Sequence, residues 1–193
     1  PLDDFKTEIK YFCNASVDSL KNLNELEGKD LSFAGIITDV QHIVGKNGKP
    51  WGRFTFEDYS DAYEFRIFNE DYLKFRHFLI PNTFLYLKVN MRRAWQNGDV
   101  RIYFTQMQQL QDVLEKMAKK ITLQLPIERI DKTKVDQIEN VVSRHKGSHH
   151  LNFVIFDREE KLKLNMPSRS SKVNITKELI EDLTSLEWNF KLN

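Results

Sequence analysis

The chain of 193 residues contains one cysteine, Cys13, and no apolar run that approaches the roughly 18 residues of a membrane-spanning helix. A single cysteine can form neither an internal disulfide nor a thiolate zinc site, so we expect a cytoplasmic protein in a reducing environment. The first residues carry no signal peptide, and the sequence starts with Pro1 rather than methionine. We expect the sequence to be a fragment of a longer protein.

Motifs of nucleophilic, metal and nucleotide chemistry are missing as well. The sequence contains no G-x-S-x-G, no P-loop lysine motif, no G-x-G-x-x-G and no H-E-x-x-H. We therefore expect no catalytic site and no cofactor. Neither sign of charge is in large excess, because 29 Lys and Arg stand against 28 Asp and Glu. Any affinity for nucleic acid must therefore come from a local patch.

Two clusters contain side chains that could bind a metal ion. The first is acidic and comprises Glu57, Asp58 and Asp61. The second comprises His145, His149 and His150. The acidic cluster falls between two alternating segments, where Asp accepts hydrogen bonds from turn amides. The histidines fall at the expected end of a helix and have no cysteine or convincing fourth ligand nearby. We expect no metal site in either cluster.

Alternation of apolar and polar residues with a period of two predicts five strands in the first part of the chain. They cover residues 31–38, 51–58, 63–68, 84–91 and 100–107. A short helix over residues 69–78 separates the third strand from the fourth, and Asn97-Gly98-Asp99 predicts the turn before the fifth. Five short strands in this arrangement have the element order of an OB-fold.

The remaining segments complete a mostly β chain with an α+β part. Leu20, Leu23 and Leu26 recur at helical spacing and predict a helical lead-in over residues 1–30, from an upstream domain. The OB-fold barrel occupies residues 31–120 and ends in a helix over residues 108–119. A small α+β domain follows over residues 121–193. Its predicted elements are strands at 121–125 and 188–192, helices at 131–145 and 176–183, and a hairpin of 151–156 with 161–166.

The alternation also assigns the two faces of the barrel strands. Phe54, Phe56, Phe65 and Ile67 point into the core, so the residues between them point outward. The outward face and its adjoining loop carry the candidate nucleic-acid-binding residues, which are Lys46, Lys49, Trp51, Arg53, Arg66, Lys88, Arg92, Arg101 and Tyr103. The cations could follow a phosphate backbone while the aromatic rings stack on bases. The same charges could instead form a solvated sheet face with cross-strand pairs.

In order and spacing, these segments resemble the C-terminal part of the bacterial DNA polymerase III alpha subunit. The segments that match the OB pattern of this family are Gly35-Ile36, Gly48-Lys49-Pro50, Phe54-Thr55-Phe56-Glu57-Asp58, and Glu64 with Phe68. Pro1-Leu2-Asp3-Asp4-Phe5 looks like the segment that leads into the OB domain, and residues 121–193 are similar to the small C-terminal domain. The chain departs from the family at Trp51 and Arg53, where small or apolar residues are usual.

This resemblance implies single-stranded DNA as the ligand of the OB domain and the clamp-loader tau subunit as the partner of the C-terminal domain. It also implies the sliding clamp as a partner in the same holoenzyme. The parent chain would be a DNA-directed DNA polymerase, a nucleotidyltransferase of DNA replication whose catalytic aspartates lie upstream, so we expect no polymerisation by this fragment. Two other hypotheses remain open: a protein-interaction scaffold without direct DNA binding, and an OB module that binds tRNA or another RNA.

Overall fold

The structure is a computed structural model that describes residues 2–95 and 98–193. The chain forms two compact units, a first unit of Pro1–Val113 and a second unit of Leu114–Asn193. The turn predicted before the fifth strand includes Asn97, which lies outside the described residues. The amide of Gly98 in this turn donates to the Trp95 carbonyl at 3.0 Å. None of the helices among the described residues is long and apolar enough to cross a membrane.

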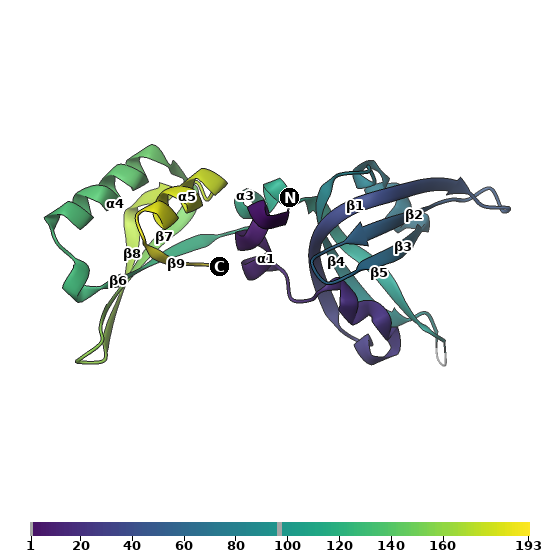
Figure 1. The fold of residues 1–193 in the computed structure, drawn as a ribbon, viewed down its shortest axis with the longest axis horizontal. Coiled ribbons are helices and arrows are strands. Elements are labelled where there is room, and N and C mark those ends of the chain that lie inside the picture. Colours follow the sequence, from purple (N-terminus) through teal and green to yellow (C-terminus); the bar gives the residue numbers. More distant parts are fainter. Residues whose placement is uncertain (1, 96–97) are drawn as a thin grey trace. The chain divides into compact units, whose positions relative to one another are not determined.

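The first unit is built on a five-stranded antiparallel sheet with the order β3-β2-β1-β4-β5 (Figure 1). Its strands are β1 (Asp30–Val44), β2 (Pro50–Glu57), β3 (Ala62–Phe68), β4 (Phe84–Arg93) and β5 (Val100–Gln109). All five predicted strands are therefore present. The first is longer than predicted because its end pairs with the start of β2, with Ile43 opposite Trp51 and Val44 opposite Pro50.

Short helices surround this sheet. They are η1 (Leu2–Phe5), α1 (Lys6–Phe12), η2 (Val17–Lys21), η3 (Leu23–Leu26), α2 (Asn69–Phe75), η4 (Arg76–Phe78) and η5 (Leu110–Asp112), followed by α3 (Val113–Met117). The leucines of the predicted lead-in helix lie on two 3-10 turns instead. Leu20 and Leu26 are nevertheless buried in the same core as the strands, so their apolar spacing reports burial rather than one continuous helix.

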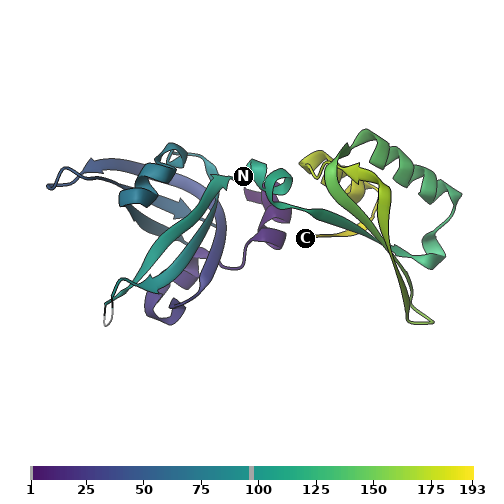
Figure 2. The same cartoon turned by 180° about the vertical axis from the view of Figure 1, so that it is seen from behind.

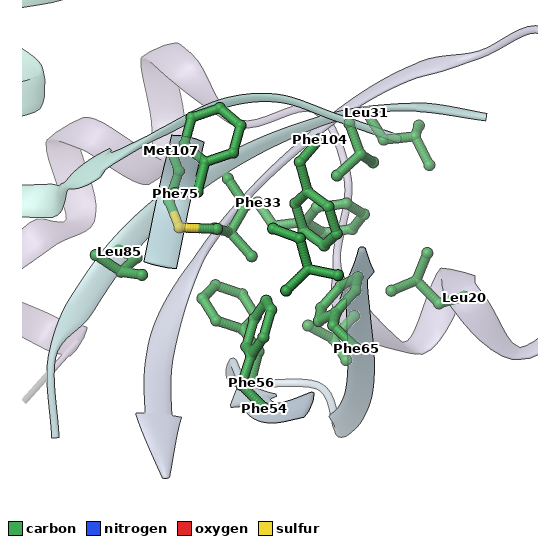
Figure 3. Close-up of a cluster of buried hydrophobic side chains, with 14 of the residues drawn as sticks. Leu20, Leu31, Phe33, Phe54, Phe56, Phe65, Phe75, Leu85, Phe104 and Met107 are labelled. Atoms are coloured by element: carbon green, nitrogen blue, oxygen red, sulfur yellow. The ribbon is translucent and has the colours of Figure 1, made fainter. Parts of the chain in front are cut away.

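The core of the first unit is aromatic, and its inward residues are those that the alternation predicted. Phe54 and Phe56 are 0% exposed, and Phe65 and Ile67 are 1% exposed. Figure 3 shows the phenylalanines gathered in this core. The Phe104 ring of β5 lies 5.9 Å from the ring of Phe54 and 5.6 Å from that of Phe65. The contact of Phe65 with Phe104 joins the two edge strands, β3 and β5, so the sheet is strongly curved.

Gly35 lies where β1 passes close to the end of β2. A Cβ at this position would lie 2.3 Å from the Glu57 carbonyl oxygen and 2.8 Å from the Phe56 ring. Only glycine allows this approach without displacing backbone, which explains the glycine expected at a sharp bend of a curved strand.

The second unit has a mixed four-stranded sheet with the order β8-β7-β6-β9 (Figures 1 and 2). Its elements are β6 (Lys120–Pro126), η6 (Ile127–Arg129), α4 (Lys132–Arg144), β7 (Lys146–Asp157), β8 (Leu162–Val173), α5 (Lys177–Ser185) and β9 (Asn189–Leu192). Asp131 caps α4 by accepting from the Lys134 amide, and Thr176 caps α5 by accepting from the Leu179 amide. Both helices and the hairpin were predicted, but the hairpin strands are longer than expected.

Candidate nucleic-acid interface

The outward faces of β2 and β3 place side chains in three cross-strand rows. Trp51 lies opposite Phe68, Arg53 opposite Arg66, and Thr55 opposite Glu64. The rings of Trp51 and Phe68 are stacked, with centroids 5.3 Å apart and planes 24° apart. Phe68 is 48% exposed, so this pair presents an aromatic surface to the solvent.

Glu64 lies between the two arginines of this face. Its carboxylate is 3.6 Å from Arg53 and 3.5 Å from Arg66, and Arg53 also donates to Gln41 at 2.6 Å. The cross-strand charge pairs that the sequence allowed are thus present. Both arginines are held in place on the sheet surface, and part of their charge is balanced by one carboxylate.

A second set of cations and rings lies on β4 and β5. Arg92 lies opposite Arg101, and each guanidinium packs over an aromatic ring. Arg92 is 4.2 Å from the centre of the Tyr103 ring, and Arg101 is 4.9 Å from that of Trp95. Trp95 is 61% exposed. It is not among the residues predicted from the sequence, although a tryptophan beside a predicted turn is a signal for an exposed ring.

Residues from both sets line one broad hollow, which we call the arginine hollow. Arg66, Phe68, Arg92, Arg101 and Tyr103 all line it, and its volume is about 1120 Å³. This exceeds the roughly 300–1,000 Å³ of a typical small-molecule pocket.

Carboxylates line the arginine hollow too, namely those of Glu64, Glu70 and Asp71. Three carboxylates therefore face the three arginines of this hollow. Asp71 has a structural partner, because it accepts from the Phe104 amide at 3.1 Å. The hollow is consequently mixed in charge rather than strongly basic.

The loop between β1 and β2 forms a second hollow, the loop hollow, lined by Lys46, Lys49, Trp51, Phe68 and Asn69 among others. Gly48 turns this loop with a φ of 74°, and its amide donates to the Gly45 carbonyl at 2.9 Å. The predicted Asn47-Gly48 turn is thus present. Phe68 and Asn69 line both hollows, so the two form one continuous path.

Seven of the nine predicted residues line this path. Arg53 lines neither hollow but is the direct cross-strand neighbour of Arg66. Lys88 also lines neither hollow, and it pairs with Ser32 on β1 and Gln106 on β5. The structure thus brings together the loop lysines, the Trp51 ring and the β3–β5 arginines, and it leaves Lys88 outside.

The candidate metal clusters have other partners. Asp58 accepts from the Ser60 amide at 2.7 Å and the Asp61 amide at 3.2 Å, as expected for a turn. His149 accepts from the Ile175 amide through Nδ1, so its Nε2 donates to the Glu115 carbonyl at 2.8 Å. Within residues 2–95 and 98–193, no group of three or more His, Cys, Asp and Glu side chains could hold a metal ion.

His145 contacts Asp182 instead, with 2.5 Å between Nε2 and the carboxylate. This hydrogen bond is the main reason that the pKa of Asp182 lies below its ordinary value, and the nearby charge of Arg144 lowers it further. The contact links the end of α4 to α5. His145 and His149 therefore have a structural role within the second unit.

Together, the two units describe a protein with a curved antiparallel sheet that carries a broad hollow, and with a separate α+β unit. Residues 121–193 match the family described as the DNA polymerase III alpha subunit, C-terminal domain. The chain is also 26% identical over 215 residues to the DNA polymerase III subunit alpha of Helicobacter pylori, covering 97% of this chain and 17% of that protein.

The same subunit of Escherichia coli O157:H7 is 22% identical over 190 residues, which are 96% of this chain and 16% of that protein. That of Saccharopolyspora erythraea is 22% identical over 153 residues, which are 77% of this chain and 13% of that protein. The matches confirm the predicted resemblance, and the chain is related to the DNA polymerase III alpha subunit. It spans less than a fifth of the length of these curated relatives.

Proposed function

We propose that the first unit is an OB-fold barrel that binds single-stranded DNA along the loop hollow and the arginine hollow. The observation that carries this proposal is the position of the path. In OB-folds, oligonucleotides bind on the face of strands 2 and 3, between the loop that joins strands 1 and 2 and the loop that joins strands 4 and 5. Here the same three regions carry Lys46 and Lys49, the Trp51–Phe68 stack, and Trp95 over Arg101.

The binding mechanism follows from the side chains of the path. Guanidinium and ammonium groups contact the phosphates, and exposed rings at both ends of the path stack on bases. Such stacking is worth roughly 1–3 kcal/mol per base and tolerates any sequence. Because phosphate contacts release counterions, the affinity falls as the salt concentration rises.

We further propose that the chain acts within the replicative polymerase holoenzyme in the cytoplasm. The relatives are named as DNA polymerase III alpha subunits, and residues 121–193 match their C-terminal domain. In this proposal the second unit docks the clamp-loader tau subunit, the sliding clamp belongs to the same assembly, and nucleotidyl transfer is carried out by other parts of the polymerase.

A scaffold that binds no DNA is the second candidate, and the charge balance of the arginine hollow favours it. Three carboxylates line the hollow beside its three arginines, and the net charge of the chain is only +1. In this alternative the arginines stabilise the sheet surface through Glu64.

A fluorescence-anisotropy titration decides between the two candidates. Labelled single-stranded oligonucleotide, duplex of equal length and single-stranded RNA are each titrated with the whole chain across a salt series. Preference for single-stranded DNA, with affinity that falls steeply in salt, supports the proposal. Absence of binding at low salt supports the scaffold, and preference for RNA supports the RNA-binding module.

A further inference from the structure

The hairpin of β7 and β8 extends beyond the rest of its sheet, as both views of the second unit show (Figures 1 and 2). Its tip is ordered by Asp157, which accepts from the amides of Glu159 and Glu160 at 2.9 and 3.1 Å. β8 is an edge strand of the four-stranded sheet, so one side of its backbone lacks a neighbouring strand in the described residues. Such an edge is a template for a further strand.

The edge carries a row of exposed apolar side chains. Leu162, Leu164 and Met166 are 65%, 57% and 44% exposed. They alternate along β8 and therefore share one face of the sheet. Leu164 lies opposite Ile155, which lies opposite Leu125 of β6. This is the face on which the helices pack, because Leu125 lines a cavity with Ile138 of α4, and Leu123, on the same face of β6, lines a cavity with Leu183 of α5. The helices thus cover the inner part of this apolar face and leave its outer part open.

The charge of the edge indicates what can cover it. From Lys161 to Val173 the sequence contains four cations, Lys161, Lys163, Arg169 and Lys172, and no Asp or Glu. All four are exposed, and none of them forms an ion pair within the described residues. A second copy of the chain would bring two basic strands together, and like charges on facing strands are destabilising. A partner strand with acidic side chains complements this edge.

We propose that β8 is the docking edge for an extended acidic segment of a partner protein, which adds to the sheet as a further strand beside residues 162–166. The segment alternates apolar residues, on the face of Leu164, with Asp or Glu, on the face of Lys163. Pro167 ends the docking stretch because it has no backbone amide to donate. The inference rests on the proposed docking role of the second unit.

A charge-swap experiment tests the proposal. The probes are two fluorescein-labelled, end-blocked seven-residue peptides, one alternating Glu with Leu and Val, the other with Lys in place of Glu. We expect the whole chain to bind the Glu peptide about tenfold more tightly than the Lys peptide. Lys163→Glu should remove this preference, and Leu164→Lys should weaken binding of the Glu peptide. Val44→Lys, at an apolar residue of β1 that is 72% exposed, is the matched control and should change nothing.

Hydrogen exchange of residues 162–166 should slow when the Glu peptide is added, because strand addition protects edge amides. Binding of neither peptide, equal binding of both, or equal effects of Leu164→Lys and Val44→Lys would overturn the proposal.

Co-elution with tau is measured on the same variants. If both β8 variants still co-elute with tau, the second unit docks tau but not through this edge. If the chain binds the peptides with charge selectivity but does not co-elute with tau, the edge is a docking site and tau is not its partner.

Discussion

At the scale of single residues, the carboxylate of Glu64 balances part of the positive charge of the two arginines on the β2–β3 face. Its carboxylate lies within 3.6 Å of Arg53 and 3.5 Å of Arg66. If these arginines contact phosphates, Glu64 competes with the DNA for them.

Replacing Glu64 with glutamine should therefore tighten single-stranded DNA binding by about threefold, since an exposed ion pair is worth less than about 1 kcal/mol. Anisotropy at low salt measures the change. Glu139→Gln on α4 of the second unit is the control and should leave the affinity unchanged. Weaker binding by Glu64→Gln would show that the arginines need this partner for their position rather than for neutralisation.

Cys13 is the second residue with an unusual environment. The pKa of its thiol is raised from an ordinary 9.0 to about 12, mainly by burial and in smaller part by the negative charges of Asp58 and Glu8. Below pH 9 the thiol is neutral in both the folded and the unfolded chain, so its contribution to stability is constant. Between about pH 9 and 12 the unfolded chain loses the proton first, so stability falls as the pH rises.

The expected result is slow alkylation of Cys13 by iodoacetamide at pH 8.5, on the order of a thousandfold below a free thiol, because only the thiolate reacts. The same reaction in urea is the control and should proceed at the ordinary rate. Rapid alkylation of the folded chain would place the thiol in a more exposed environment than the structure shows.

At the scale of elements, rings extend the proposed binding path beyond the β2–β3 face. Trp95 beside β5 and Trp51 on β2 each present a ring beside a cation or another ring. Both rings are suited to stack on unpaired bases.

Trp95→Ala and Trp51→Ala should each weaken single-stranded DNA binding by about tenfold or more, given roughly 1–3 kcal/mol per stacked base. Tyr59→Ala is the control and should have little effect, because Tyr59 is 62% exposed and its hydroxyl donates to Asp3, whereas the Trp95 ring contacts Arg101 of the arginine hollow. The test also has a direct optical readout. With Trp51 and Trp188 changed to phenylalanine, the emission of Trp95 should be quenched by the oligonucleotide, and an unchanged emission would remove Trp95 from the path.

The contact between α4 and α5 carries a prediction about pH. The hydrogen bond from His145 lowers the pKa of Asp182, so the folded state is favoured while this carboxylate is charged. This stabilisation is fully present above the ordinary carboxyl pKa and is lost as the pH falls through the lowered pKa of Asp182.

Asp182→Asn should lower the melting temperature of the second unit at pH 7 and have a much smaller effect at pH 2–3. Thermal unfolding of the whole chain by circular dichroism measures both. Asp136→Asn, an exposed position on α4, is the control. An equal loss at both pH values would mean that the substitution disturbs packing rather than the charge contact.

The elements of the chain differ in how far they could be predicted from the sequence. The strands of the first unit could be predicted because each has one buried face, and burial of Phe54 or Ile67 imposes a period of two. The 3-10 turns around Leu20 could not, since three leucines at this spacing suit any structure that buries them. The ends of β7 and β8 were missed because their extensions are held by pairing with each other, as between His150 and Lys172, and not by an apolar alternation.

The candidate site shows the same limit. The outward position of Arg66 follows from the alternation of its own strand. The exclusion of Lys88 from the path does not, because it depends on which strands neighbour β4 and where they curve. The pairing of Trp95 with Arg101 is likewise a property of the folded sheet, since the ring approaches a side chain from the next strand.

At the scale of the whole molecule, the near balance of charge makes the salt dependence informative. A net charge of +1 provides little long-range attraction for DNA, so the response to salt reports the local contacts. For single strands, each phosphate contact contributes a slope of about 0.7 to the logarithmic dependence of affinity on salt.

Arg53→Ala combined with Arg66→Ala should therefore weaken binding and reduce this slope by roughly 1.4. Lys88→Ala should leave the slope unchanged, because Lys88 lines neither hollow and its cross-strand neighbours are Ser32 and Gln106, whereas Arg53 lies directly opposite Arg66 of the arginine hollow. An unchanged slope in the double variant would show that neither arginine contacts phosphate. A reduced slope in Lys88→Ala would show that the path continues across β4.

Asn69 stands where the loop hollow meets the arginine hollow, and its backbone has a φ of 51°. Glycine, asparagine and aspartate tolerate this left-handed conformation, whereas branched and bulky side chains do not. Mutation can therefore make this point of the path neutral, acidic or empty, but it cannot readily place a ring or a branched side chain there. Over evolutionary time, substitutions at position 69 can therefore change the charge in the middle of the path but can hardly change its shape.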